Sequence, residues 1–335
     1  MAKAKKETLI LGMDVGGTKT AAALMNDRGE VLGQGIGGSA NINWVPVKQA
    51  EKSFATAIKA AQKMAGIKQL KCDIVIIGIE PDPKPLVPFV RKLTGARKIL
   101  HKKEGECSLV GGLVQDTGIS LIAGTGSVGW GRNEKGETHV TSCWGTIGDE
   151  GSAYDLARRG VNAAFWAEDK RGRPTKLVEK IAARFGKKRM IDIVTPLYTA
   201  PDMRKDFASL SRIVMETALE GDEVAREVVI EGARQIAHII TTCAEVLGLH
   251  TKPYKVAATG GLVSKGGWYF DLVQQFVREK HDATLVLPKF EPVIGACLIG
   301  LRELGFERTE EVIRNLERSV PQTQLKHAEQ ANRRR

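Results

Sequence analysis

The first hundred residues alternate apolar runs of strand length with turns and one helical pattern. Leu9–Asp14, Thr20–Met25 and Val31–Gly35 are short apolar runs bounded by glycine and polar residues, which is typical of strands joined by tight turns. Val47–Met64 has apolar residues at helical spacing, and Ile74–Ile79 has the length and composition of a buried strand. This part of the chain is therefore predicted to be an α/β layer.

The same opening recurs in the second part of the chain. Ile119–Ala123 has the pattern of a strand that ends in a glycine turn, and a hairpin pattern follows around residues 132–136. Tyr254–Thr259, which ends in two glycines, and Ala283–Leu287 are two further strand patterns. Helical spacing is found in three longer segments: Ala153–Ala167, Phe207–Leu219 and Asp222–Leu247. Both halves thus share the order strand, glycine turn and hairpin.

We place the domain boundaries where these two sets of elements meet. The N-terminal lobe is expected at residues 1–117, completed by a C-terminal helix at about 293–316 that begins after Pro292. The C-terminal lobe, with helical insertions, is expected at residues 118–292. Residues 317–335 are polar and basic and include Pro321, so we expect a flexible basic tail there.

Composition narrows the class of protein. A chain of 335 residues with 42% hydrophobic and 27% charged residues fits a soluble protein of two ordinary domains. No apolar run approaches the roughly 20 residues of a membrane helix, and the first residues lead directly into a strand. We expect a cytoplasmic protein without a membrane partner.

Charge and cysteine spacing exclude two further classes of site. The net charge of +11 comes from scattered residues with small clusters at Lys3–Lys6, Lys187–Arg189 and Arg333–Arg335, without interleaved aromatics. We therefore expect no nucleic-acid partner, although a basic surface also suits an anionic substrate. The five cysteines are far apart and form no CxxC pair, which argues against a structural zinc or a disulfide framework.

The first chemical motif is the turn that follows the first strand. Asp14 lies at the end of that strand, and Gly16 and Gly17 let backbone amides approach an anion, with Thr18 and Lys19 next in the turn. Threonine hydroxyls can add hydrogen bonds to phosphate oxygens. We expect Asp14 to face a magnesium ion through water. The alternative is an ordinary hairpin with a capped turn.

Two further glycine turns follow strands. Residues 123–129 match the GxGxxG dinucleotide fingerprint, but that fingerprint must open a helix, and here a strand pattern follows. A second phosphate clamp, made by Thr125, Gly126 and Ser127, is the better interpretation. Gly260 and Gly261 form the third turn, which can offer a flat backbone surface to an adenine and a ribose.

These turns carry a family resemblance over residues 8–305. The chain resembles the BadF/BadG/BcrA/BcrD ATPase family, and within it the N-acetylglucosamine kinase branch of the sugar kinase, Hsp70 and actin superfamily. The motifs that carry the resemblance stand in the family's order: DxGGTxT at residues 14–20, AGTGS at 123–127, WG at 144–145, GDEGSAY at 148–154, GG at 260–261 and PVIGA at 292–296.

The resemblance implies both a fold and a reaction. The fold is α/β, a duplicated ribonuclease-H-like (actin/hexokinase-type) two-lobe ATPase fold with ATP and Mg²⁺ in the cleft between the lobes. The reaction is ATP-dependent phosphorylation of a small-molecule amino sugar similar to N-acetylglucosamine. A homodimer is compatible with the family.

Four residues correspond to the family's sugar site. Asn41 resembles the loop asparagine that meets the sugar, and Trp144 and Gly145 resemble the wall beside the acetamido group. Asp149 resembles the carboxylate that holds sugar hydroxyls, a role that suits an ionised acid. Its alternative role is to cap the helix that begins near Ser152.

The chain departs from the kinase pattern at two places. Glu104 stands where the kinases carry their catalytic aspartate, and it can still act as a general base, although its carboxylate is one methylene further out. Glu80 lies in a segment where the kinases have a small-residue turn beside the sugar. Both departures bear on the identity of the substrate.

Two other functions remain open from the sequence. The segment from Glu104 to Cys107 imitates the Glu-x-x-Cys of the activators of 2-hydroxyacyl-CoA dehydratases, which are ATPases that couple hydrolysis to conformational change and hold an iron–sulfur cluster. In that case Cys143 would be the second cysteine; otherwise both thiols are buried and inert. The other alternative is a nucleotide-binding regulator without turnover.

Overall fold

The computed structural model describes residues 8–200 and 202–332, and these form two compact units. Of the described residues, unit 1 comprises 8–115 and 289–332, and unit 2 comprises 116–200 and 202–288. The division lies within a few residues of the boundaries expected at 117/118 and 292/293. The chain thus leaves unit 1 once, builds unit 2 from one continuous segment, and returns.

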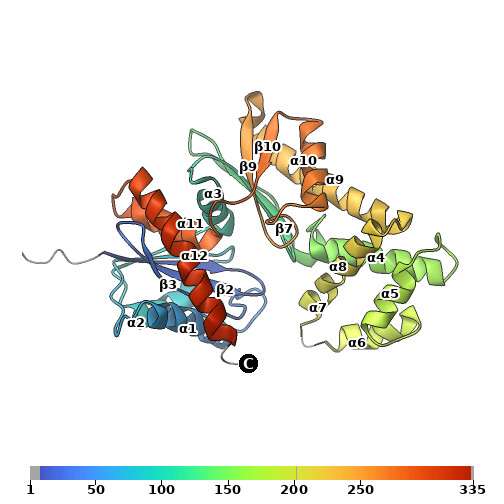
Figure 1. The fold of residues 1–335 in the computed structure, drawn as a ribbon, viewed down its shortest axis with the longest axis horizontal. Helices are drawn as coiled ribbons and strands as arrows, with labels where there is room; N and C mark the ends of the chain where they lie inside the picture. Colours follow the sequence, from blue (N-terminus) through green and yellow to red (C-terminus); the bar gives the residue numbers. More distant parts are fainter. Residues whose placement is uncertain (1–7, 201, 333–335) are drawn as a thin grey trace, which may run out of the picture. The chain divides into compact units, whose positions relative to one another are not determined.

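Unit 1 is built on a five-stranded sheet (Figure 1). Its strands lie in the order β3-β2-β1-β4-β5, with β1–β2–β3 antiparallel and β1–β4–β5 parallel. Their bounds are β1 Leu9–Val15, β2 Thr20–Asn26, β3 Val31–Gly37, β4 Ile74–Gly78 and β5 Lys98–Lys102. The four strands predicted in this part of the chain are confirmed, whereas β5 has no counterpart in the sequence prediction.

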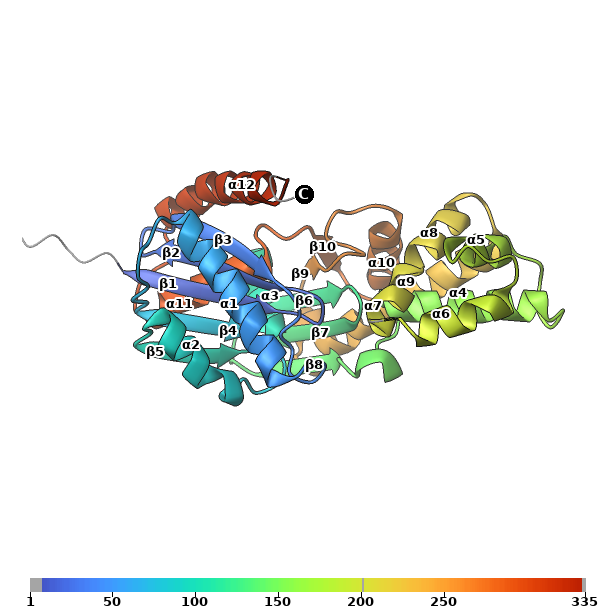
Figure 2. The same cartoon turned by 90° about the horizontal axis from the view of Figure 1, so that it is seen from below.

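Both faces of this sheet are buried because successive side chains point to opposite faces. Leu11 and Met13 of β1 face one core, which includes Phe54 of α1, and Ile10 faces the other, which includes Ile294 of α11. Figures 1 and 2 show that α1 and α12 each run beside β3. The helices of unit 1 are α1 Val47–Met64, α2 Val87–Thr94, α3 Glu104–Leu113, α11 Pro292–Glu303 and α12 Glu310–Asn332.

Unit 2 repeats the sheet of unit 1. Its strands lie in the order β10-β9-β6-β7-β8, so that β6 takes the central place of β1, β7 and β8 extend the antiparallel side, and β9 and β10 the parallel side. Their bounds are β6 Gly118–Ala123, β7 Ser127–Arg132, β8 Thr138–Ser142, β9 Tyr254–Thr259 and β10 Ala283–Val286. The duplicated α/β architecture predicted from the sequence is confirmed.

Most helices of unit 2 come between β8 and β9. They are α4 Ala153–Glu168, α5 Leu177–Arg184, α6 Val194–Tyr198, α7 Met203–Ser209, α8 Ser211–Leu219 and α9 Glu223–Val246, with α10 Trp268–Arg278 after β9. Figure 2 shows α4 to α8 gathered as the helical part of this unit. The single helix expected at 207–219 is divided, because the Leu210 amide bonds to the Phe207 carbonyl and tightens the chain between α7 and α8.

The expectation of a flexible tail from residue 317 is wrong for its first residues. Helix α12 continues to Asn332, and Val312, Leu316 and Val320 recur every four residues on its buried side. Ser319 Oγ also accepts a hydrogen bond from the Val31 amide of β3 at 3.0 Å. Apolar periodicity therefore outweighs polar composition here. The basic clusters at 3–6 and 333–335 lie outside the described residues.

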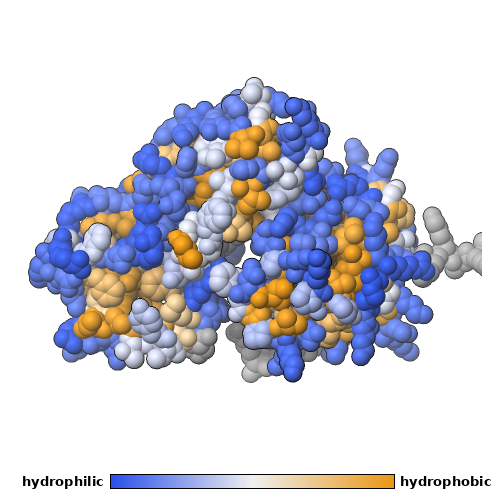
Figure 3. All heavy atoms as spheres, turned by 180° about the vertical axis from the view of Figure 1, so that it is seen from behind, coloured by the Kyte–Doolittle hydropathy of each residue, from blue (hydrophilic) through white to orange (hydrophobic). Residues whose placement is uncertain are grey.

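The surface carries few large apolar side chains. The face shown in Figure 3 is mainly hydrophilic, with hydrophobic residues in several separate groups. Two of the most exposed apolar residues, Trp144 and Ile147, belong to one loop of unit 2 and are 73% and 96% exposed. Within the described part of the chain, no helix is long and apolar enough to cross a membrane.

Candidate functional site

In unit 1, Asp14 lies at the mouth of the β1–β2 turn. The turn is closed by a hydrogen bond from the Gly16 amide to the Lys19 carbonyl at 3.0 Å. Gly16 has a negative φ, and a Cβ there would come no closer than 3.5 Å to its nearest neighbour, so neither backbone strain nor packing requires glycine. The side of the turn is therefore open to a ligand. Thr18 and Lys19 are exposed in the same turn.

Two polar atoms beside this turn are buried and have no hydrogen-bond partner among the described residues. They are Asp14 Oδ1 and Thr20 Oγ1. Burial raises the pKa of Asp14 to about 6, while the Lys19 ammonium lowers it and the Glu291 carboxylate raises it. An orphaned carboxylate oxygen is costly, which indicates that a cation or a hydrogen-bond donor belongs to this position.

Glu104 is the first residue of α3 and lies on the same side of the sheet as Asp14. Burial and the charges of Asp14, Glu106 and Glu104 raise the pKa of the Cys107 thiol well above its ordinary value. Cys107 lies beneath Gly78, the strand residue paired with Asp14, so both carboxylates act on one buried sulfur. The protonated thiol is a packing side chain in this unit. Glu106 turns instead toward Lys102, at 3.8 Å.

Two predicted residues of unit 1, Glu80 and Asn41, are held by contacts within the unit. Glu80 is held by Lys103, whose Nζ lies 3.5 Å from Glu80 Oε2 and donates to the Glu80 carbonyl at 3.0 Å. The charge of Glu80 is therefore locally balanced. Asn41 is buried, and its Oδ1 accepts the Asn43 amide at 3.0 Å, which shapes the loop from within.

In unit 2, two of the predicted turns lie against each other. Gly124 lies beside Gly260 and Gly261, and the Leu262 amide donates to the Ala123 carbonyl at 3.0 Å. Gly260 has a φ of +91°, and a Cβ there would collide with the Ala123 backbone, so the fold itself requires this glycine. Gly261 has no neighbour within 4 Å of its Cβ position. Gly260 is thus required for the conformation of the turn, whereas the space beside Gly261 is open.

The turn at Gly124–Ser127 is braced by the start of α4. The amides of Ala153 and Tyr154 donate to the carbonyls of Gly124 and Thr125 at 2.8 and 3.3 Å. Ser127 Oγ donates to the Glu150 carbonyl at 2.8 Å. The hydroxyl proton of Ser127 is therefore used within the protein, whereas the Thr125 side chain is partly exposed.

Asp149 is buried in a loop that also holds Trp144 and Gly145. Its Oδ1 accepts the Gly145 amide at 2.9 Å. Burial raises the pKa of Asp149, while hydrogen bonds from the Trp144, Gly145 and Ser127 amides and the charge of Arg204 lower it. The N-cap of α4 is Ser152, whose Oγ accepts the Asp155 amide, so Asp149 does not take the capping role considered from the sequence.

Sequence reasoning missed Arg204. Its Nη2 lies 3.5 Å from the Cβ position of Gly126, and the Asp149 carboxylate closes the same position to any side chain. Arg204 belongs to α7, more than fifty residues further along the chain, in a segment without a recognisable motif. The position of Arg204 beside Asp149 follows from the packing of α7 and could not be predicted from the sequence.

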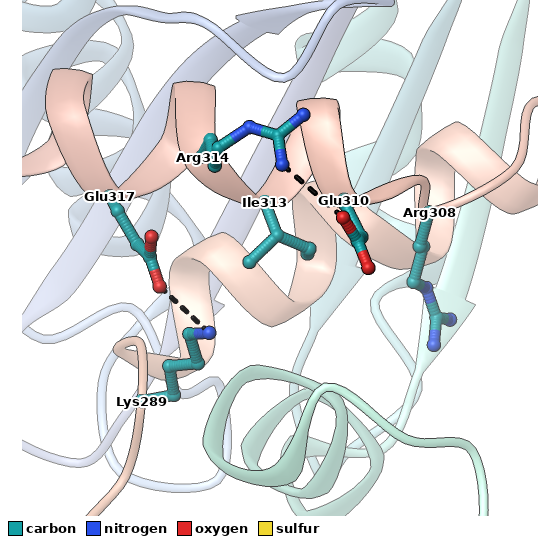
Figure 4. A pocket seen from close by; sticks show the side chains of 6 residues that line it. All are labelled: Lys289, Arg308, Glu310, Ile313, Arg314 and Glu317. Atoms are coloured by element: carbon teal, nitrogen blue, oxygen red, sulfur yellow. Dashed lines mark hydrogen bonds and ion pairs between the residues drawn. The ribbon is translucent and has the colours of Figure 1, made fainter.

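One small pocket lies away from these residues. It has a volume of about 320 Å³ and is lined mainly by charged side chains of α12 together with Lys289 (Figure 4). Lys289 pairs with Glu317 at 2.8 Å and Arg314 with Glu310 at 3.3 Å, as the dashed lines show. Since these charges satisfy each other and no predicted site residue lines the pocket, it is not the candidate site.

Comparison with known proteins finds kinases that match along most of the chain. An N-acetylmuramic acid/N-acetylglucosamine kinase of Clostridium acetobutylicum is 28% identical over 301 residues, which cover 88% of this chain and 98% of the relative. An N-acetyl-D-glucosamine kinase of Dictyostelium discoideum is 23% identical over 311 residues, with 88% and 98% covered.

The fold also has close counterparts among solved structures. A protein of Chromobacterium violaceum, described as a candidate N-acetylglucosamine kinase, superposes with a TM-score of 0.69 at 21% identity, covering 88% of this chain and 99% of the other. This likeness shows that the two chains share one fold. A family model matches residues 11–300, and the chain therefore belongs to the BadF/BadG/BcrA/BcrD ATPase family.

Proposed function

We propose that this protein transfers the γ-phosphoryl group of ATP to an N-acetylated amino sugar. The observation that carries the proposal is the buried Asp14 Oδ1, which has no hydrogen-bond partner among the described residues, beside a glycine turn where a Cβ on Gly16 would come no closer than 3.5 Å to another atom. The class of acceptor comes from the relatives, two of which are named as kinases of N-acetylglucosamine. Phosphoryl transfer needs positioning and charge stabilisation more than covalent chemistry from the protein.

The residues present fit ATP and Mg²⁺. The amides around Gly16 and Gly17, with Thr18 and Lys19, would hold phosphate oxygens in unit 1, and Thr125 and Gly126 would do so in unit 2. Ser127, whose hydroxyl donates to the Glu150 carbonyl, would brace that turn and would not bind phosphate itself. Gly260 and Gly261 would carry the adenosine. Asp14 would hold Mg²⁺ through water, and as a single carboxylate it suits an ion that keeps much of its hydration shell. The ion would neutralise charge on the phosphates.

Glu104 would act as the general base. A carboxylate at the start of α3, on the same side of the sheet as Asp14, can accept the proton of the attacking sugar hydroxyl. Helix α3 holds it firmly, because Gly111 of α3 and Gly295 of α11 let the two helices approach so closely that a Cβ at either would clash with backbone. The close packing of α3 can compensate for the extra methylene by which the Glu104 side chain is longer than that of an aspartate.

Each unit has its own predicted sugar contacts. Asn41 would contribute from unit 1, and Trp144, Gly145 and Asp149 from the loop of unit 2. The exposed indole of Trp144 supports this role, since a large apolar side chain held in solvent on a structured loop is available for stacking on a sugar. Asp149, buried and anchored by the Gly145 amide, is a fixed acceptor for hydroxyl groups.

The test is ADP release from Mg-ATP by the purified protein, measured with N-acetylglucosamine, N-acetylmuramic acid, N-acetylmannosamine, glucosamine and glucose. Strong stimulation by one N-acetylated sugar is expected. Slow hydrolysis that no sugar changes would instead favour an ATPase that drives a conformational change, and absence of hydrolysis would favour a regulator. A cytoplasmic location and a homodimer are part of the proposal, the latter to be checked by sedimentation equilibrium.

A further inference from the structure

The loop that carries Asp149 is held at three successive backbone carbonyl groups. The Asp149 carbonyl accepts the Ser152 hydroxyl at 2.6 Å. The Glu150 carbonyl accepts the Ser127 hydroxyl at 2.8 Å. The next carbonyl, that of Gly151, accepts a third hydroxyl, which comes from a helix far along the chain. The loop is therefore fixed by side chains from several elements of unit 2.

The third hydroxyl is the phenol of Tyr269, in the first turn of α10. It donates to the Gly151 carbonyl at 2.6 Å, across 118 positions of the chain. Tyr269 is buried, and burial raises the pKa of its phenol well above its ordinary value; the charge of Asp155 raises this pKa further, and that of Arg159 lowers it. The phenol therefore keeps its proton and remains a hydrogen-bond donor at physiological pH.

Gly151 is held from two further sides. Its amide donates to Asp155 Oδ2 of α4 at 3.0 Å, and Arg159 Nε donates to the same oxygen at 2.8 Å. Gly151 has a φ of +68°, and a Cβ there would lie 2.4 Å from the Gly232 carbonyl oxygen of α9. Three helices, α4, α9 and α10, thus fix this one residue.

The Tyr269 hydroxyl does more than fill space in the core. A phenylalanine ring would occupy nearly the same volume, and among the described residues the only hydrogen bond of this hydroxyl goes to the Gly151 carbonyl. Asp149 lies two positions before Gly151, and its carboxylate is the predicted acceptor of sugar hydroxyls. A displacement of about 1 Å from a productive position can reduce a rate roughly 100-fold, so the place of this loop matters for the reaction.

We infer that Tyr269 is a positioning residue for the sugar, because it holds through Gly151 the loop that presents Asp149. This inference rests on the proposed function, since it takes Asp149 as part of the sugar site. Loss of the Tyr269 hydroxyl should then impair the use of the sugar more than the use of ATP. A residue with a purely structural role would affect stability alone.

The test compares Tyr269→Phe with Tyr254→Phe. Tyr254 is a matched control, because it is a buried tyrosine at the start of β9 in the same unit, and its hydroxyl shares a hydrogen bond with His281 Nδ1 at 2.9 Å. Both variants lose one phenol hydrogen bond, but only Tyr269→Phe loses the bond to the loop. The kinetics with ATP and with N-acetylglucosamine or N-acetylmuramic acid, and the Kd of each sugar with Mg-ADP, are measured well below both unfolding midpoints.

Tyr269→Phe is expected to lower kcat/KM for the sugar roughly tenfold or more, while the KM for ATP changes less than about twofold. Hydrogen exchange of the amides of residues 149–152 should become faster, with the rest of unit 2 unchanged. Tyr254→Phe should show neither effect. Ser152→Gly removes the hydroxyl bond to the Asp149 carbonyl and leaves a tolerated N-cap, so it should also lower kcat/KM for the sugar and decides the question if Tyr269→Phe does not fold.

The possible results separate the inference from the proposed function. Unchanged sugar kinetics and loop exchange in Tyr269→Phe, or equal losses for sugar and ATP or in both tyrosine variants, would overturn the inference while the function stands. If the wild type binds a sugar without phosphorylating it, the function fails, and Kd decides the inference: weaker sugar binding in Tyr269→Phe but not in Tyr254→Phe supports it. A wild type that neither binds nor phosphorylates any sugar overturns both.

Discussion

Replacing Asp14 by asparagine is expected to stabilise the protein while it removes nucleotide turnover. Asp14 has a pKa of about 6 in the folded protein against an ordinary value of 3.8, mainly because it is buried. Above pH 6 the carboxyl is ionised in both the folded and the unfolded state, so folding must bury a charge. Asparagine has nearly the same shape and no charge.

The size of this effect follows from the shift in pKa. Ionisation of Asp14 costs the folded state about 3 kcal/mol at pH 8, because each pKa unit corresponds to about 1.4 kcal/mol. Between the two pKa values the folded state binds more protons than the unfolded state, so the cost declines as the pH falls, to about 1 kcal/mol at pH 4.5. Asp14→Asn should therefore be more stable than the wild type by about 3 kcal/mol at pH 8 and by about 1 kcal/mol at pH 4.5.

The assay is thermal unfolding by calorimetry at the two pH values, with and without Mg-ATP. Unit 1 has about 160 residues, so a gain of about 3 kcal/mol should raise the midpoint of its transition by roughly 6–12 °C. Mg-ATP should stabilise the wild type more than the variant, since a ligand that binds only the folded state shifts unfolding by mass action. A variant less stable at pH 8, or a gain independent of pH, would refute the reasoning.

Three further predictions concern other positions. Gly261→Ala should fold normally but weaken ATP binding about tenfold, because its methyl group would occupy open space at the turn. Gly260→Ala should instead lower the stability of unit 2, because the φ of Gly260 is +91° and its Cβ would strike Ala123. Calorimetry measures the change in stability, and nucleotide titration measures the change in binding. Glu104→Gln should lower kcat by about 100-fold or more with little change in the KM for the sugar, and equal changes in kcat and KM would argue against a general base. Leu316→Ala should destabilise unit 1 by about 2–5 kcal/mol in urea unfolding, and no loss would mean that α12 is not part of the core.

Sequence patterns predict the strands and helices whose apolar residues recur at one regular spacing. The strands around Asp14 and Ala123 are buried, and each ends in a glycine turn, so local patterns identify both. Strand β5 escapes prediction because it lies at the edge of the sheet, where Lys98 and His101 are exposed and interrupt the apolar pattern. Composition alone misjudges α12, where Leu316 is covered despite its polar neighbours.

The residues of the candidate site also fall into two groups: those that local sequence patterns predict, and those whose role depends on tertiary contacts. Gly16 and Gly261 are conspicuous in the sequence, and the structure adds that neither is required by packing, which the sequence cannot reveal. Lys103 neutralises Glu80 through a contact between residues more than twenty positions apart. The place of Arg204 beside Asp149 depends on how α7 packs on α4, a tertiary feature without a local signal.

The central claim is that phosphate leaves ATP for a sugar, and the most direct measurement is the ratio of phosphorylated sugar to ADP. The purified protein is incubated with Mg-ATP and N-acetylglucosamine or N-acetylmuramic acid, and both products are quantified by mass spectrometry over time. The account predicts one phosphosugar for each ADP formed, with Asp14→Asn forming neither. ADP that accumulates with inorganic phosphate and without any phosphosugar would contradict it.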